Sequence, residues 1–260
     1  MAPMTKTSLH QWIPDQPGAW VMAASPALSG LVAGAWFGSL TVDALWLTVC
    51  WLLCYCVQFT AARWLKSHGS RRFLPPALGY GALLAVVGLP FLLTHPGILW
   101  WAPPIALLAA ISFASSWLRR ERSLWANAAA VCASCLMPML TFCYGVDEPR
   151  VPYVSAVGLS LSLSFALAQF GSVLFVKTMI RERGSRAYLA ASWLWHAAFL
   201  LLAVRVGSVW LVVLCVLLLA RAVALPVMAR RRRVPPLATG LTECVSSLCA
   251  FAAVTVSVLV

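Results

Sequence analysis

Apolar residues recur in nine long stretches, and charged residues fall almost entirely between them. A helix of about 20 apolar residues crosses the hydrocarbon core of a bilayer, which is about 30 Å thick. The pattern predicts helices at residues 19–38, 42–62, 75–93, 98–118, 124–144, 152–176, 187–204, 206–226 and 237–258. We therefore expect an all-α polytopic bundle in one transmembrane domain, residues 19–260, preceded by a cytoplasmic segment, residues 1–18.

Helix-breaking residues support these divisions. Pro75-Pro76 and Pro235-Pro236 open two of the stretches, and His95-Pro96-Gly97 separates two others. The weakest division is Val204 to Gly207. Without a turn there, about 40 apolar residues would run together, which is too long for one crossing.

The basic residues predict the orientation of the bundle. With nine helices, 17 of the 19 Lys and Arg residues fall in loops or helix ends on one side. Only Arg150 and Arg205 fall on the other. Cytoplasmic loops carry the excess of Lys and Arg, so the amino terminus is expected inside and the carboxyl terminus outside.

Composition agrees with a membrane protein and argues against other classes. The chain is 62% hydrophobic and 10% charged, with a mean hydropathy of +0.88, whereas soluble domains are about a quarter charged. The net charge of +12 is explained by topology, so nucleic acid is not expected as a partner. The nine cysteines lie in or beside apolar stretches, which argues against a disulfide framework.

Polar residues inside a span are costly and usually face the protein interior or a wet cavity. Four lie in the predicted cytoplasmic half and His196 lies near the middle of its span, which suggests a cavity open to the cytoplasm. The alternative is ordinary hydrogen bonding between helices. Glu243 needs a partner, which Arg221 or one of Arg230 to Arg233 could supply. The cavity would be lined by Gln58, Asn127, Gln169, His196 and Glu243.

The stretch from Phe175 to Arg183 carries a second candidate site. On a continuing helix Lys177 and Arg181 share a face, as do Thr178 and Glu182. A paired cationic face at the membrane surface could hold a phosphate, a diphosphate or a lipid headgroup. Alternatively, this is a helix end whose basic side chains reach into the interface.

Several catalytic signatures are missing from the sequence. It has seven acidic residues and no paired-aspartate motif that would hold Mg²⁺ against a diphosphate. It also has no H-E-x-x-H, G-x-S-x-G or Walker motif. We therefore expect no metal centre and no cofactor.

Four segments carry a resemblance to the YwiC-like membrane proteins. Ile13 to Trp20 resembles the P-x-Q-H-G-A-W segment of that family, and F-V-K-T-M-I-R-E-R at Phe175 to Arg183 resembles another of its motifs. Arg119 to Asn127 and Gly240 to Glu243 are also similar. Pro17 stands here in place of the family histidine. Gln16, in the first motif, joins the candidate ligand-binding residues. The resemblance implies no particular activity.

The nine-helix layout with basic loops also looks like that of the UbiA-type intramembrane prenyltransferases. Those enzymes carry aspartate motifs in the loops after spans two and six. The corresponding residues 63–72 and 177–186 contain no aspartate here. Either the fold is shared without the metal chemistry, with cations replacing the metal as the diphosphate partner, or the match in topology is coincidental.

Three functions are compatible with these observations. The first is binding or transport of an amphipathic anion, such as an isoprenoid or phospholipid, in the plasma membrane of a bacterium. The second is a metal-free, UbiA-like lipid transferase in which Lys177 and Arg181 hold diphosphate and Glu243 or His196 handles a proton. The third is a structural partner in a membrane complex. The candidate site residues are Gln16, Gln58, Asn127, Gln169, Lys177, Arg181, Glu182, His196 and Glu243.

Overall fold

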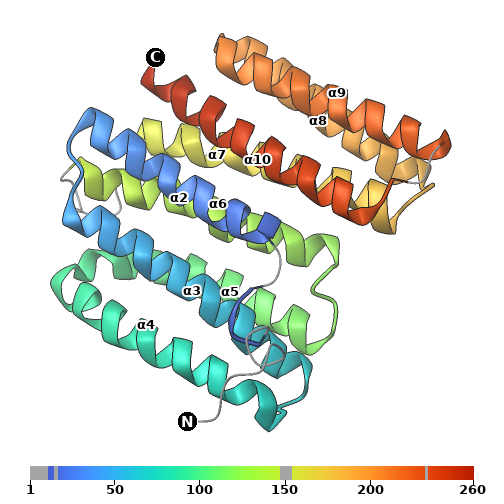
Figure 1. Ribbon diagram of the computed structural model, residues 1–260. Coiled ribbons are helices and arrows are strands. Elements are labelled where there is room, and N and C mark those ends of the chain that lie inside the picture. The colour runs from blue at the N-terminus through green and yellow to red at the C-terminus, as the bar shows by residue number, and fades with distance from the viewer. Residues whose placement is uncertain (1–10, 15–16, 147–153, 232–233) are drawn as a thin grey trace.

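Nine long helices make up the bundle in the computed structural model, which describes residues 11–14, 17–146, 154–231 and 234–260 (Figure 1). In this described part, nine helices are long and apolar enough to cross a membrane, as predicted. The long helices are α2 (Pro17–Phe37), α3 (Val42–Lys66), α4 (Leu74–Thr94), α5 (Ala102–Trp117), α6 (Leu124–Gly145), α7 (Ala156–Val176), α8 (Arg186–Val206), α9 (Val209–Arg231) and α10 (Pro236–Leu259). Short helical turns are η1 (Arg71–Phe73), η2 (Pro96–Trp101) and η3 (Lys177–Arg181).

Local sequence sets the helix ends. A Thr or Ser hydroxyl before the first turn accepts a hydrogen bond from a backbone N–H of that turn in four helices, and Ser208 accepts such a bond from Leu211 at the start of α9. The junction after Val206 is a real turn, because Gly207 adopts a left-handed conformation with φ of 77° and ends α8. The capping residues of the four helices are Thr41, Ser123, Ser155 and Ser185.

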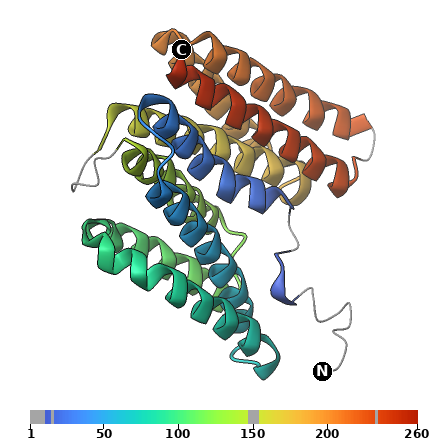
Figure 2. The ribbon, with the colours of Figure 1, turned by 60° about the vertical axis from the view of Figure 1, so that its left-hand side comes forward.

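The helices are arranged in layers, with α3, α4 and α5 on one side of the bundle and α8 and α9 on the other (Figures 1 and 2). Helices α2, α6, α7 and α10 lie between them. The end at which α3, α5, α7 and α9 finish, at the right in Figure 1, collects the described basic loops. We call it the basic end.

Helices α2 and α6 approach closely because glycines leave room for the partner backbone. A methyl group on Gly30 would lie 2.6 Å from the Pro138 Cα, and one on Gly145 would lie 2.7 Å from the Gly34 Cα. Small residues at such contacts let membrane helices pack by van der Waals contact.

Prolines inside two helices free backbone carbonyls that other helices then satisfy. Pro26 in α2 has no N–H for the carbonyl of Met22, four residues earlier. The Oγ of Ser134 donates to that carbonyl at 2.7 Å. In α9, Pro226 likewise frees the Ala222 carbonyl, which accepts the indole N–H of Trp193 at 2.9 Å.

Candidate functional site

The structure divides the predicted site residues between different parts of the bundle. Gln16 lies outside the described residues. Gln58, on α3, donates from Nε2 to the Ser112 hydroxyl of α5 at 3.0 Å. It therefore lies on the opposite side of the bundle from α8 and α9 (Figure 1). Asn127 is half-buried in the first turn of α6.

Gln169 in α7 connects two neighbouring helices. Its Nε2 donates to the Met22 carbonyl at 2.9 Å, and its Oε1 accepts from the Cys135 thiol at 3.8 Å. Together with the Ser134 hydroxyl, the bond to Met22 satisfies the carbonyl that Pro26 leaves without a helical partner. Gln169 thus stabilises the broken helix, a structural role that a search for buried amides does not distinguish from ligand binding.

Glu243 has the partner that its sequence position called for. The Nη1 of Arg221 on α9 donates to its Oε1 at 2.6 Å, and both side chains are buried. The Nη2 of Arg221 donates to the Ser172 hydroxyl at 3.4 Å, and the guanidinium lies 4.2 Å from the Phe175 ring centre. A buried ion pair inside a membrane span is costly to form and commonly marks a functional site.

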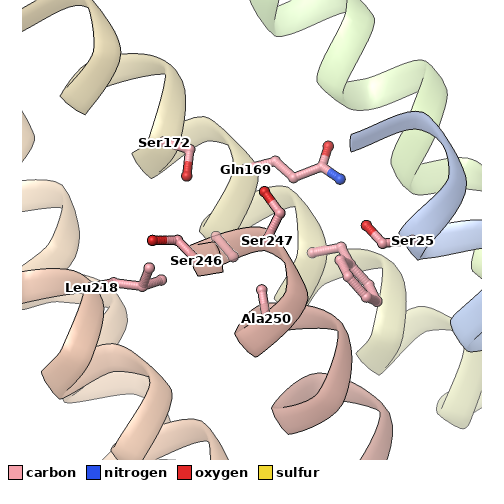
Figure 3. Close-up of a pocket in the computed structure, with 9 residues that line it drawn as sticks. Ser25, Gln169, Ser172, Leu218, Ser246, Ser247 and Ala250 are labelled. Atoms are coloured by element: carbon pink, nitrogen blue, oxygen red, sulfur yellow. The ribbon is translucent and has the colours of Figure 1, made fainter. Parts of the chain in front are cut away.

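A small cavity, lined by apolar side chains together with serine hydroxyls and Gln169, adjoins this ion pair between α2, α7, α9 and α10 (Figure 3). Its free volume is about 10 Å³, room for roughly one water molecule. In this conformation it is too small for a lipid headgroup. Figure 3 shows the Ser247 hydroxyl pointing toward Gln169. The lining residues are Ser25, Phe165, Ala168, Gln169, Ser172, Leu218, Ser246, Ser247 and Ala250.

His196 is 1% exposed on α8. Its Nδ1 lies 2.7 Å from the Ser192 carbonyl, and because a carbonyl only accepts, Nδ1 carries the proton. Nε2 then has a free lone pair, and the described side chains and backbone offer it no hydrogen-bond donor. It faces Gly171, where an added methyl group would lie 3.0 Å from it. His196 therefore packs tightly against α7.

The predicted α-helix does not continue through Lys177. Residues 177–181 form a π-helical turn, closed by the bond from the Glu182 N–H to the Lys177 carbonyl at 2.8 Å. Since a π turn is wider than an α turn, residues four apart no longer align. Lys177 is 6% exposed, whereas Arg181 is exposed and Glu182 is half-buried. The interpretation of one shared cationic face is therefore corrected: the first side chain points inward and the second outward.

The Lys177 ammonium donates to the Arg122 carbonyl at 2.7 Å and lies 5.9 Å from the Tyr188 ring centre. Among the described residues it forms no ion pair with a carboxylate. The carbonyl belongs to the loop between α5 and α6. This contact fixes the loop against the π turn at the basic end.

The same loop is held from the other side by Lys66, which donates to the Glu121 carboxylate. Burial acts to raise the pKa of this carboxyl, but the Lys66 hydrogen bond and the nearby Arg122 charge outweigh it and lower the pKa below its ordinary value. Arg119 adopts φ of 55° in this loop. Arg119, Arg120 and Arg122 are all exposed.

Sequence reasoning missed the serines of the cavity. Ser25, Ser172, Ser246 and Ser247 lie in apolar stretches that contain many other serines, so only their convergence identifies them. For metal binding, the described residues bring no three His, Cys, Asp or Glu side chains together.

Comparison with known proteins places the chain in a family. The family model described as YwiC-like protein matches residues 13–142, half of the chain. The chain is 26% identical over 201 residues to the Uncharacterized protein YwiC of Bacillus subtilis, covering 76% of this chain and 79% of that protein. It is 25% identical over 218 residues to an uncharacterized protein of Haemophilus influenzae, covering 82% of this chain and 86% of that one. No solved structure matches. The chain belongs to the YwiC-like protein family.

Proposed function

We propose that this protein binds an amphipathic anion at the basic end of the bundle and serves its transport or retention in the membrane. The basic end faces the cytoplasm in this proposal, since it carries the excess of Lys and Arg. The bacterial relatives support a bacterial plasma membrane.

The observation that carries the proposal is the buried charge of Lys177, which has no ion-pair partner among the described residues and feels the Glu182 carboxylate only at longer range. Its ammonium has three donors, one of which is used on the Arg122 carbonyl. A buried cation is costly without a counter-ion, and the described carboxylates do not supply one within ion-pair distance. An anionic headgroup would neutralise it and take the remaining donors.

The surroundings of Lys177 favour an amphiphile over a small soluble anion. Arg122 and Arg181 are exposed beside Lys177. The positive charge of Arg122 acts electrostatically on the Arg181 guanidinium. Ile180, in the same turn, is 42% exposed, and Trp117 before the adjoining loop is 51% exposed. Cations next to exposed apolar side chains suit a charged headgroup with a hydrocarbon tail.

The polar residues of α7 extend from this surface toward the cavity. Ser172 precedes Lys177 by five residues and Gln169 by eight, which on a helix is about 7.5 and 12 Å. Both line the cavity. An anion could thus pass from Lys177 to Arg221 and then toward the serines if α7 and α10 separated. The transferase hypothesis gains no specific support from these contacts.

Calorimetric titration of the purified protein in dodecyl maltoside tests the proposal. The probe is decane-1-sulfonate below its micelle concentration, and methanesulfonate supplies the same headgroup without a tail. We expect saturable binding of the long probe and loss of that binding in Lys177→Ala/Arg181→Ala. Arg186→Ala, a single charge removed from an exposed position at the same end, is the control and should retain binding. Equal affinity for methanesulfonate would indicate a free-anion site. Unchanged binding in the double variant would refute the Lys177 site.

A further inference from the structure

We propose that binding of an anion at Arg221 is coupled to uptake of a proton by Glu243, so that each monovalent anion enters the site with one proton. This inference rests on the proposed function and assigns it a coupling ion. It is carried by the geometry of the Arg221–Glu243 pair.

The pair leaves Arg221 with a donor to spare. Arg221 is 9% exposed and Glu243 is 8% exposed. Their hydrogen bond is a single contact from Nη1 at 2.6 Å, whereas an Arg–carboxylate pair often forms two parallel bonds. The Nε of Arg221 is buried, and no acceptor for it lies among the described residues. A second acceptor can therefore bind the guanidinium without displacing the first.

The described α7 residues that contact the pair are neutral. Helix α7 presents Ser172 and Phe175, and α2 presents Ser25 at the adjoining cavity. Arg221 on α9 is the described charge that acts on Glu243. The pair is therefore neutral as a unit before an anion binds.

A second negative charge at Arg221 would leave the buried site with a net charge of minus one. Interactions between charges are strong in this low-dielectric interior, so the neutral carboxylic acid becomes the favoured form of Glu243. In this step an O–H bond forms on the carboxylate, hydronium or the acid form of the buffer loses the proton and is left as water or the buffer base, and Arg221 keeps its charge. Nothing is oxidised or reduced. Departure of the anion reverses the step.

His196 is the other buried group that could accept a proton. Its Nε2 is free, but the Arg221 guanidinium acts on the ring electrostatically and opposes a second positive charge there. Glu243 is thus the better proton acceptor of the two.

The test measures protons taken up per bound anion, by titrating decane-1-sulfonate into the whole protein in two buffers of different ionisation enthalpy at pH 7. The sulfonate does not titrate near this pH, so any uptake belongs to the protein. We expect about one proton per bound probe for the wild type, by linkage, and none for Glu243→Gln, which still binds. Glu243→Asp keeps a carboxyl group and should keep the uptake, and Asp43→Asn, a carboxylate removed from the opposite end, is the control.

The outcomes separate the two proposals. If the wild type binds the probe without taking up a proton, the coupling is wrong while the anion site stands. If it binds no probe, both fall. Uptake that persists in Glu243→Gln and disappears in His196→Gln would overturn the assignment to Glu243. If Glu243→Gln fails to fold, Glu243→Asp and His196→Gln still test the assignment. The proposal requires both variants to retain proton uptake, so loss of uptake in either one would overturn it.

Discussion

The Nη1 of Arg221 lies 2.6 Å from the Oε1 of Glu243, between two helices that both cross the bundle. Removing one partner from a buried pair leaves an isolated charge, which costs about 3–5 kcal/mol, whereas replacing both by apolar residues is often neutral. Arg221→Met should therefore lower the stability strongly, and Arg221→Met/Glu243→Leu should recover most of it. The measurement is the unfolding midpoint in a graded detergent titration. If the double variant lost as much stability as the two single variants together, a buried ion pair would be contradicted.

Gln169 and Pro26 are expected to be coupled through the Met22 carbonyl. Gln169→Leu removes one hydrogen bond from that carbonyl, at a cost of about 1 kcal/mol for a bond between membrane helices. In a Pro26→Ala background the restored backbone N–H joins the Ser134 hydroxyl as a donor to this carbonyl and replaces the Gln169 amide, so Gln169→Leu should cost less there. Gln58→Leu, whose partner is Ser112, is the matched control and should cost the same in both backgrounds. The test compares the unfolding midpoints of the wild type, Gln169→Leu, Pro26→Ala and the double variant.

The Lys66–Glu121 pair should give a small pH dependence of stability. Because the folded-state pKa of Glu121 lies below its ordinary value of 4.5, the pair stabilises the protein above that value. The contribution is lost as pH falls through the folded pKa. The thermal midpoint of the wild type should exceed that of Glu121→Gln at pH 7, by the equivalent of less than about 1 kcal/mol. The difference should shrink below pH 4.5. A difference that is constant from pH 7 to pH 3 would show that the pair does not stabilise the fold.

The orientation follows from the basic end and can be measured with fusions in cells. Alkaline phosphatase joined after Val260 should be active, because the carboxyl terminus is expected outside. The same enzyme joined at Glu121, in the loop between α5 and α6, should be inactive, and green fluorescent protein at that position should fluoresce. The reverse pattern at both positions would place the basic end outside the cell, and the proposal that the anion site faces the cytoplasm would then be wrong.

Much of the fold could be predicted from the sequence because each helix is one long, mainly apolar stretch with a recognisable stop. Gly207 ended α8 where the division was weakest, since glycine adopts positive φ without strain. The π turn at Lys177 could not be predicted. The spacing of apolar residues does not distinguish an α turn from a π turn. The contact between Lys177 and Arg122 at this turn also joins residues 55 apart in the chain.

The candidate site was predictable only in part. The partner of Glu243 was among those named, because buried carboxylates in membranes need a cation nearby. Gln58 and Gln169 looked alike in the sequence, yet Gln58 contacts α5, whereas Gln169 contacts α2 and α6. Depth along a span can be inferred from a sequence, but the direction of a side chain around the helix depends on packing partners.

Native mass spectrometry of the protein purified in mild detergent tests the central claim most directly, because it reports what the bundle retains from its own membrane. We predict a bound anionic amphiphile on the wild type and on Arg186→Ala, and its loss from Lys177→Ala/Arg181→Ala. The same lipid load on the double variant, or retention of zwitterionic lipid alone by the wild type, would contradict an anion site at Lys177.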